Sequence, residues 1–205
     1  MSEHGTTMTT NLVIIDVQND FCRGGALAVP DAEAILPVVN GLIREFDQVI
    51  LTQDWHPTGH VSFASSHPGQ LSYDRVAQPY GEQILWPDHC VEDTDGAAFH
   101  PGLVLPPDIV IVRKGVHKEV DSYSAFFEND RKTPVGLNTL LQERGVRELV
   151  LAGLATDFCV LHTALDARKL GYAVTVLEAG CRGVDIGGSL ASAWAKMAEA
   201  GVRRG

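Results

Sequence analysis

The sequence predicts an α/β protein with a doubly wound, mostly parallel sheet of about six strands and helices on both faces. Short apolar runs rich in β-branched residues, typical of strands covered on both sides, alternate with segments whose apolar residues recur at helical spacing. Such alternation indicates parallel strands joined by crossover helices. The 205 residues fit one domain, 1–205, with its own core, and no internal repeat or linker divides them.

The predicted elements follow in order along the chain. Strands are expected at 12–17, 49–52, 109–113, 148–152 and 173–177, with a last short strand beginning near Val202. Helices are expected at 38–46, 137–141, 160–170 and 190–197. Residues 1–11 are polar and are expected to form a disordered lead. Residues 54–108 hold most of the prolines and keep no periodicity, so we expect a long functional loop there.

Composition excludes several classes of protein. Asp and Glu (26) outnumber Lys and Arg (16), and the resulting net charge of −10 disfavours binding to nucleic acid or to an anionic membrane. No apolar run approaches the roughly 18–20 residues of a membrane-spanning helix, and the N-terminus lacks the layout of a signal peptide. The four cysteines form no CxxC pair, so we expect reduced thiols in a cytoplasmic protein. An exposed apolar helix face would allow a homo-oligomer, but the sequence does not specify the oligomeric state.

Four chemically active residues follow the predicted strands. Asp16 ends the first strand, Asp54 and Lys114 come just after the second and third, and Cys159 lies one turn beyond the fourth. In an open parallel sheet, ligands bind outside the carboxyl ends of the strands, near the point where strand order reverses. We therefore expect these side chains to meet at one edge of the sheet.

Three of these residues suit nucleophilic catalysis. Thr156 or Asp157 is expected to cap the helix that holds Cys159, and free N–H groups in its first turn favour a thiolate and could hold an oxyanion. Asp16 would be the general base, and Lys114 would balance the negative charge that the two share. The simpler interpretations are a buried inert cysteine, an aspartate that caps the Gly24-Gly25 loop, and a solvated lysine.

A second group of residues suits a divalent metal ion. Asp54 and His56 stand two positions apart at a strand end, and the irregular segment adds His60 and His89. One carboxylate with two or three imidazoles suits Zn²⁺, and also Fe²⁺ or Mn²⁺. The alternative is a set of unrelated surface histidines, the interpretation that we keep for the other histidines, including His162.

Five motifs occur in one order along the chain. They are Asp16-Val17-Gln18-Asn19-Asp20-Phe21-Cys22 with Gly24-Gly25-Ala26-Leu27-Ala28-Val29, then Asp54-Trp55-His56-Pro57, Trp86-Pro87-Asp88-His89-Cys90, Lys114-Gly115, and Gly153-Leu154-Ala155-Thr156-Asp157-Phe158-Cys159-Val160. In this the chain resembles the nicotinamidase branch of the isochorismatase-like cysteine hydrolases, from about Leu12 to about Asp185.

The resemblance implies hydrolysis of nicotinamide to nicotinate and ammonia, and activity on pyrazinamide. By position it implies a catalytic triad, four metal ligands, ring-binding aromatic residues, and an oxyanion hole of backbone N–H groups after a cis peptide at Leu154–Ala155. The implied triad is Asp16, Lys114 and Cys159, and the implied metal ligands are Asp54, His56, His60 and His89. The implied ring-binding residues are Phe21, Trp86 and Tyr123, and the oxyanion hole would use the N–H groups of Ala155 and Cys159.

Other functions compete with this one. A related hydrolase of N-carbamoyl or ureido substrates would keep the triad but has no evident need for the metal ligands. An isochorismatase-type vinyl-ether hydrolase would not need Cys159. A metal oxygenase could use two histidines and one carboxylate, which would leave Cys159 beside Asp16 and Lys114 unexplained. A non-enzymatic binding module would lack a nucleophile or a base, and here both are present.

Overall fold

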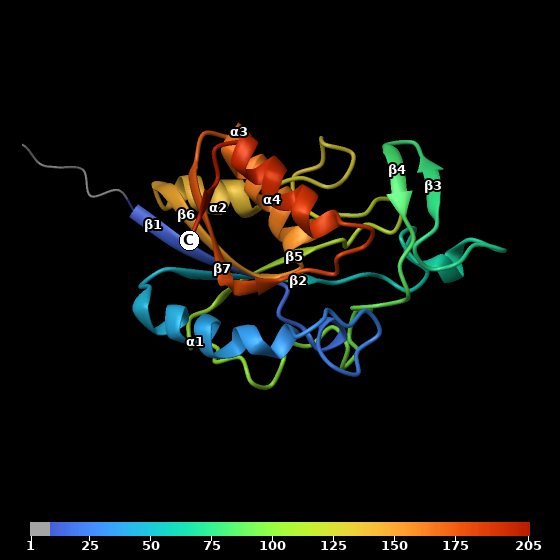
Figure 1. The fold of residues 1–205 in the computed structure, drawn as a ribbon, viewed down its shortest axis with the longest axis horizontal. Helices are drawn as coiled ribbons and strands as arrows, with labels where there is room; N and C mark the ends of the chain where they lie inside the picture. Colours follow the sequence, from blue (N-terminus) through green and yellow to red (C-terminus); the bar gives the residue numbers. More distant parts are fainter. Residues whose placement is uncertain (1–8) are drawn as a thin grey trace, which may run out of the picture.

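A central sheet of six strands dominates the computed structural model, which describes residues 9–205 (Figure 1). The strand order is β5-β2-β1-β6-β7-β8, and every neighbouring pair is parallel. The strands span Thr9–Ile15 (β1), Val49–Asp54 (β2), Val110–Lys114 (β5), Val146–Leu154 (β6), Ala173–Arg182 (β7) and Arg203–Arg204 (β8). The predicted fold class is confirmed.

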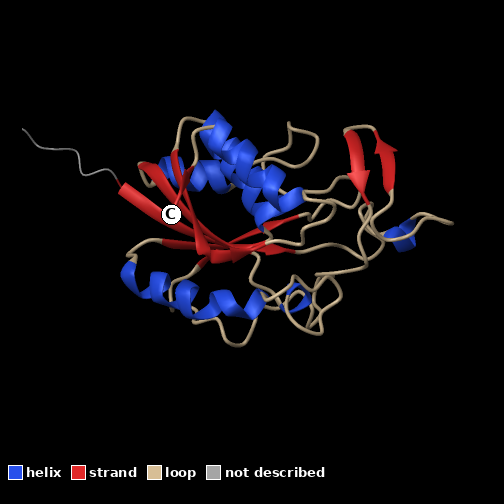
Figure 2. Cartoon of the chain, in the orientation of Figure 1, coloured by secondary structure: helices blue, strands red, loops and turns tan. Residues whose placement is uncertain are grey.

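Helices cover both faces of the sheet (Figure 2). Figure 1 shows α1 on one face and α2, α3 and α4 on the other. Their bounds are Leu36–Glu45 (α1), Leu137–Glu143 (α2), Leu161–Lys169 (α3) and Ser189–Glu199 (α4). Alternate residues of β1 enter the two cores, Leu12 and Ile14 on the side of α1, Val13 and Ile15 on the side of the other helices. Burial on both faces explains why the strand sequence is apolar throughout.

Several boundaries differ from the prediction. β1 begins at Thr9, so residues 9–11 are strand rather than disordered lead, whereas residues 1–8 lie outside the described part. Asn11 is fully buried, and its amide donates to the side chain of Gln48, which makes this polar start compatible with pairing. β1 also ends at Ile15 instead of residue 17, because Asp16 adopts a left-handed φ of 49°. β6 and β7 extend beyond their predicted ends by continued parallel pairing.

The segment between β2 and β5 is mostly irregular, as predicted, but it contains a hairpin that the prediction missed. β3 (Arg75–Gln78) and β4 (Gly81–Ile84) pair antiparallel and stand beyond the main sheet (Figure 1). Of their side chains only Gln83 is buried. Because this hairpin has so little contact with the core, its sequence lacks the alternation of apolar and polar residues by which a strand is predicted.

Strand order reverses between β1 and β6. From β1 the sheet continues to β2 and β5 on one side, and from β6 to β7 and β8 on the other. Gly153, near the end of β6, has a φ of +128°, and a Cβ there would lie 2.1 Å from the carbonyl oxygen of Ile15. Only glycine therefore allows the two strands to approach here. The crevice at this point is where a ligand site is expected.

Candidate active site and metal centre

A buried lysine lies at the centre of the site. Lys114 ends β5, and its ammonium lies 2.9 Å from Asp16 Oδ2 and 3.3 Å from Cys159 Sγ. It also donates to Asp54 Oδ1 and, at 3.1 Å, to the carbonyl oxygen of Ser122. Burial disfavours this charge, but the carboxylates of Asp16 and Asp54 outweigh it and hold the pKa of Lys114 well above its usual value. The structure thus brings together the four residues predicted to meet at the strand ends.

Asp16 is placed to accept a proton. Its Oδ1 accepts a hydrogen bond from Thr52 Oγ1 at 2.5 Å, whereas Oδ2, although near Lys114, has no aligned donor among the described residues. Burial raises the pKa of Asp16, Lys114 opposes this, and Asp54 adds to it, so that the pKa lies above its ordinary value. The loop-capping role that the alternative gave to Asp16 belongs to Asp20, whose carboxylate accepts from the Ala26 N–H.

Cys159 lies in a π-helical turn, Thr156–Val160, that follows β6 directly. Its side chain is buried, and burial raises the pKa of the thiol well above the usual value despite the opposing charge of Lys114, with Asp16 raising it further. The turn's N–H groups were expected to favour a thiolate, whereas burial of the side chain favours the neutral thiol. A base is needed to take the thiol proton.

The predicted side-chain cap of this turn is also wrong. Ala155 precedes the turn, and no side chain caps it. The carboxylate of Asp157 accepts hydrogen bonds from the backbone N–H groups of Val184 and Asp185 and from the Ser189 hydroxyl. Asp157 therefore joins the turn to the start of α4. The peptide bond between Leu154 and Ala155 is cis, as the resemblance implied.

Asp54, His56 and His89 form a donor set suited to a metal ion. Asp54 Oδ2 lies 3.7 Å from His56 Nε2 and 3.9 Å from His89 Nε2, and all three side chains are buried. His56 Nδ1 donates to the Gly115 carbonyl at 2.9 Å and His89 Nδ1 to the Pro87 carbonyl at 2.8 Å, since a carbonyl can only accept. Backbone partners of this kind orient ligating histidines and leave Nε2 toward the metal. The residues therefore fit Zn²⁺, Fe²⁺ or Mn²⁺.

His60 does not join this set. Its ring stacks on His56 with the centroids 4.3 Å apart, but its nitrogens have other partners. Nδ1 accepts from Ser62, and Nε2 lies 3.1 and 3.2 Å from the carbonyl oxygens of His117 and Val120. Nε2 must then carry the proton and has no lone pair to offer. In this arrangement His60 joins neighbouring loops, and the expectation that it is a fourth ligand stays a prediction.

The position of the His56 ring leaves no room for a side chain at residue 115, so replacing Gly115 tests the metal centre. Its φ is +64°, and a Cβ there would lie 2.3 Å from His56 Cε1 and 2.5 Å from Nδ1. Gly115→Ala should therefore displace the imidazole and weaken metal affinity by about 10–100-fold, as loss of a ligand's orienting partner does. Competition with a chelator measures this. Gly69→Ala is the matched control, because its φ is +83° with nothing within 4 Å, and equal affinity in both variants would contradict the role of Gly115.

An inner cavity connects the nucleophile, the metal donors and a group of aromatic rings. It is lined by Phe21, Leu27, Asp54, His56, Trp86, His89, Asp121, Tyr123, Ala155, Phe158, Cys159 and Val184. All three aromatic residues predicted to bind a ring are present, and so is Ala155. The cavity is small, with a volume of about 30 Å³.

The prediction missed a group of residues that supports this cavity. Phe158 packs edge-on against Trp86, with the ring centroids 4.8 Å apart. Trp86 Nε1 donates to the Tyr123 hydroxyl at 3.1 Å, and Gln83 of β4 donates to that hydroxyl and, at 2.9 Å, to Asp121 Oδ2. Phe158 was detectable from its place beside Cys159. Gln83 was not, because nothing in the sequence indicates that the hairpin turns this amide inward.

The chain also resembles known proteins. A family model described as the Isochorismatase domain matches residues 10–203. A nicotinamidase of Acinetobacter baylyi is 49% identical over 193 residues, which are 94% of this chain and 90% of that protein. The range of the family model includes every residue of the candidate site.

Solved structures agree with these sequence matches. A nicotinamidase/pyrazinamidase of Acinetobacter baumanii superposes with a TM-score of 0.95 at 49% identity, covering 97% of this chain and 96% of that one. PnC1 of L. infantum, in complex with nicotinate, gives 0.83 at 38% identity over 96% and 92%. A pyrazinamidase of Pyrococcus horikoshii in complex with zinc gives 0.80 at 33% identity over 96% and 98%.

Proposed function

Because this chain belongs to the isochorismatase family, we propose that it is an amidohydrolase that converts nicotinamide and water to nicotinate and ammonia, and that it also acts on pyrazinamide. The observation that carries the proposal is the position of Cys159, within reach of Lys114 and lining the same cavity as Asp54, His56 and His89. The nicotinate complex of the L. infantum protein supports the choice of substrate.

The first half of the proposed reaction forms a thioester. Asp16 Oδ2 takes the proton from Cys159 Sγ, and the sulfur attacks the carboxamide carbon of a ring held between Phe21 and Trp86. The backbone N–H groups of Ala155 and Cys159 receive the oxyanion, and each such donor is worth about 2.7–4 kcal/mol in other acyl transfers. Protonated Asp16 then gives its proton to the departing nitrogen, and ammonia leaves.

The second half returns the enzyme to its starting state. Asp16 takes a proton from a water molecule, and the resulting hydroxide attacks the thioester carbon. The tetrahedral species collapses, the C–S bond breaks, and Asp16 returns the proton to Cys159. Lys114 stays protonated throughout, because Asp54 remains its carboxylate partner while Asp16 carries the proton, and the ammonium limits the negative charge near the sulfur.

We further propose one divalent metal ion, Zn²⁺ in the first place, held by Asp54, His56 and His89. When bound, this ion would supply a Lewis-acid site that positions the pyridine nitrogen of the substrate. The donor set of the described residues supports this, and so does the zinc complex of the P. horikoshii protein.

Competing activities explain less of the site. A hydrolase of N-carbamoyl or ureido substrates needs neither the metal donors nor the aromatic walls of the inner cavity. A metal oxygenase would leave the contact between Lys114 and Cys159 without a purpose. The first of these activities remains as an outcome of the test below.

Ammonia release from nicotinamide tests the proposal. The purified, metal-loaded protein should release ammonia, lose turnover on chelation, and regain it when Zn²⁺ is added. Benzamide, which lacks the ring nitrogen, is the matched substrate and should react far more slowly. Turnover indifferent to chelation would remove the metal from the proposal but keep the cysteine chemistry. Absence of ammonia from nicotinamide would overturn the proposal and direct the search to carbamoyl and ureido substrates.

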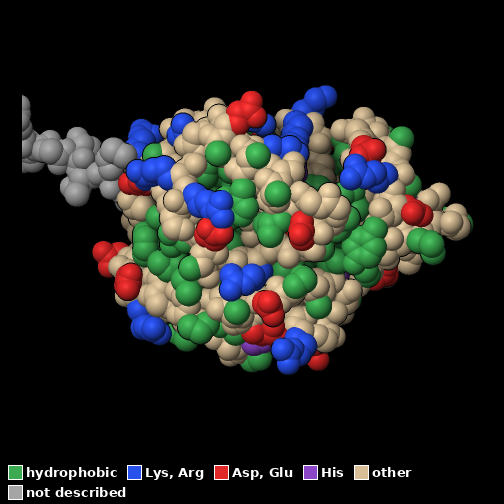
Figure 3. Space-filling view, in the orientation of Figure 1, with side chains coloured by type: hydrophobic (Ala, Val, Ile, Leu, Met, Phe, Trp, Pro, Cys, Tyr) green, Lys and Arg blue, Asp and Glu red, His purple; other side chains and the backbone are tan. Residues whose placement is uncertain are grey.

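We also propose a cytoplasmic location with no nucleic-acid or membrane partner. The four cysteines are all buried and free, as expected for reduced thiols. Acidic and basic side chains are interspersed on the face in Figure 3, without a continuous basic stripe. Among the helices of residues 9–205, none is long and apolar enough to cross a bilayer.

A further inference from the structure

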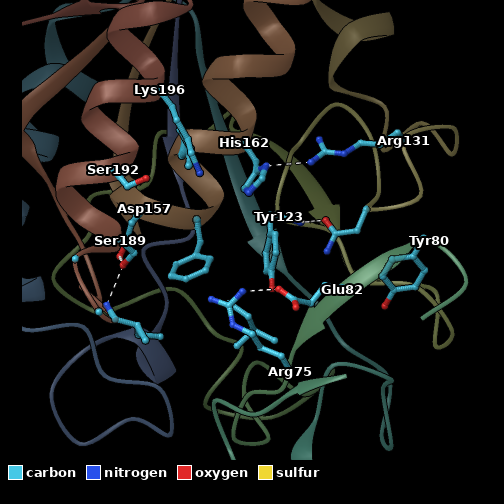
Figure 4. A pocket seen from close by; sticks show the side chains of 17 residues that line it. Arg75, Tyr80, Glu82, Tyr123, Arg131, Asp157, His162, Ser189, Ser192 and Lys196 are labelled. Atoms are coloured by element: carbon cyan, nitrogen blue, oxygen red, sulfur yellow. Dashed lines mark hydrogen bonds and ion pairs between the residues drawn. The ribbon is translucent and has the colours of Figure 1, made fainter. Parts of the chain in front are cut away.

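A second, larger cavity lies directly outside the inner cavity (Figure 4). This outer cavity has a volume of about 510 Å³ and shares two wall residues, Tyr123 and Phe158, with the inner one. Its other walls come from the β3–β4 hairpin, from the loop that contains Arg131, and from the starts of α3 and α4. The catalytic scheme uses none of its charged residues.

The outer cavity has an excess of positive charge that its own carboxylates do not neutralise. Three basic side chains, Arg75, Arg131 and Lys196, line it together with two acidic ones, Glu82 and Asp157. Glu82 is paired with Arg75, and Asp157 accepts the hydrogen bonds that join it to α4. Arg131 shares the single carboxylate of Asp166 with a second cation from α3. Lys196 has no ion pair among the described residues. In a protein of net charge −10, such a hollow attracts anions.

His162 adds a directed donor to these charges. The Arg131 guanidinium lies 3.3 Å from His162 Nδ1, and because a guanidinium can only donate, Nδ1 must accept. The neutral ring then carries its proton on Nε2. Burial lowers the pKa of His162 to about 4, and the charges of Arg131 and Lys196 contribute, so the ring stays neutral near pH 7. Figure 4 shows Arg131, His162 and Lys196 around one hollow.

Aromatic rings form a continuous wall from the inner to the outer cavity. The Phe158 centroid lies 4.8 Å from that of Trp86 and 5.6 Å from that of Tyr123. Tyr123 in turn lies 5.3 Å from His162, with the two rings inclined by only 30°. A flat ring leaving the inner cavity would therefore keep an aromatic neighbour until it reaches the cationic groups.

We propose that the outer cavity is a second binding site, selective for aromatic carboxylates, with the carboxylate held by Arg131, His162 and Lys196 and the ring against Tyr123. The proposal rests on the proposed function in one respect: the product of that reaction, nicotinate, belongs to this class, whereas the neutral amide substrate does not. Two cations and an N–H donor discriminate between them, because the anion forms ion pairs with both cations whereas the neutral amide offers only a carbonyl acceptor. The site would retain the product on its way out.

Binding to the Cys159→Ala protein, loaded with metal, tests this site. Nicotinamide titrated first fills the inner cavity without turnover, and nicotinate is then titrated onto the saturated protein by calorimetry. Nicotinate should still bind, and the double variant Arg131→Gln/Lys196→Gln should weaken that binding by roughly tenfold or more. Lys132→Gln, which removes an exposed charge outside the cavity wall, should change it by less than twofold.

Several results would overturn the second site. One is the loss of all nicotinate binding when nicotinamide is present. Another is an unchanged affinity for nicotinate in the double variant. A third is that inorganic phosphate displaces nicotinate more effectively than benzoate does. A failure of the proposed function gives a different result: nicotinamide itself would not bind in the first titration, whereas nicotinate would still bind in a manner dependent on Arg131 and Lys196. In the active enzyme the double variant should also relieve inhibition by nicotinate severalfold while the KM for nicotinamide changes less than twofold.

Discussion

Replacing Cys159 by alanine should abolish the release of ammonia from nicotinamide, with kcat lowered by at least about 10⁴-fold. The sulfur is the nucleophilic atom placed beside both Lys114 and Asp16, and no other cysteine lines the inner cavity among the described residues. Without it no thioester can form, and water would have to attack an unactivated amide. Initial rates over a range of nicotinamide concentrations measure the loss.

The same variant separates chemistry from metal binding. Cys159 is not in the Asp54, His56 and His89 set, so the metal content of Cys159→Ala should equal that of the wild type. Cys159→Ser is the matched control, because it keeps a nucleophilic atom of higher pKa in the same place and should retain only a small residual activity. Turnover near the wild-type level in the alanine variant would contradict the thioester scheme.

The part of the site that the sequence predicts best depends on the sheet. Strands buried on both faces appear as uninterrupted apolar runs, so a charged residue that ends such a run is visible as an exception. Asp16, Asp54 and Lys114 were found in this way. Parallel pairing then brings the ends of neighbouring strands together, which explains why three residues far apart in the chain could be predicted to meet.

The parts that the sequence predicts less well depend on loops. His60 has the right residue type and spacing for a ligand, but its Nε2 lies against carbonyls of a loop some 60 residues away. Asp157 has the right position for a cap, but two backbone N–H groups beyond β7 compete for its carboxylate. Likewise, Arg131, His162 and Lys196 come from three separate elements and share no motif. Local spacing cannot show which long-range partner a polar side chain will meet.

Replacing Lys114 by methionine should destabilise the protein and stop catalysis together. The change keeps the apolar stem but leaves Asp16 and Asp54, both buried, without their shared cation. Removing one partner of a buried ion pair lowers the free energy of unfolding by about 3–5 kcal/mol. Urea unfolding in the presence of a chelator measures this without a contribution from metal. Lys169→Met, which removes an exposed lysine paired with Asp166, is the control and should change stability by no more than about 1 kcal/mol.

A second substitution distinguishes the charge from the catalytic role of its neighbour. If the loss of stability in Lys114→Met comes from uncompensated carboxylates, adding Asp16→Asn should restore part of it, because one of the two negative charges disappears. The double variant should nevertheless stay inactive, since an amide at position 16 cannot take the proton of Cys159. If the double variant is no more stable than Lys114→Met, the loss of stability comes from changed packing rather than from uncompensated charge. Recovery of activity in it would contradict the assignment of Asp16 as the base.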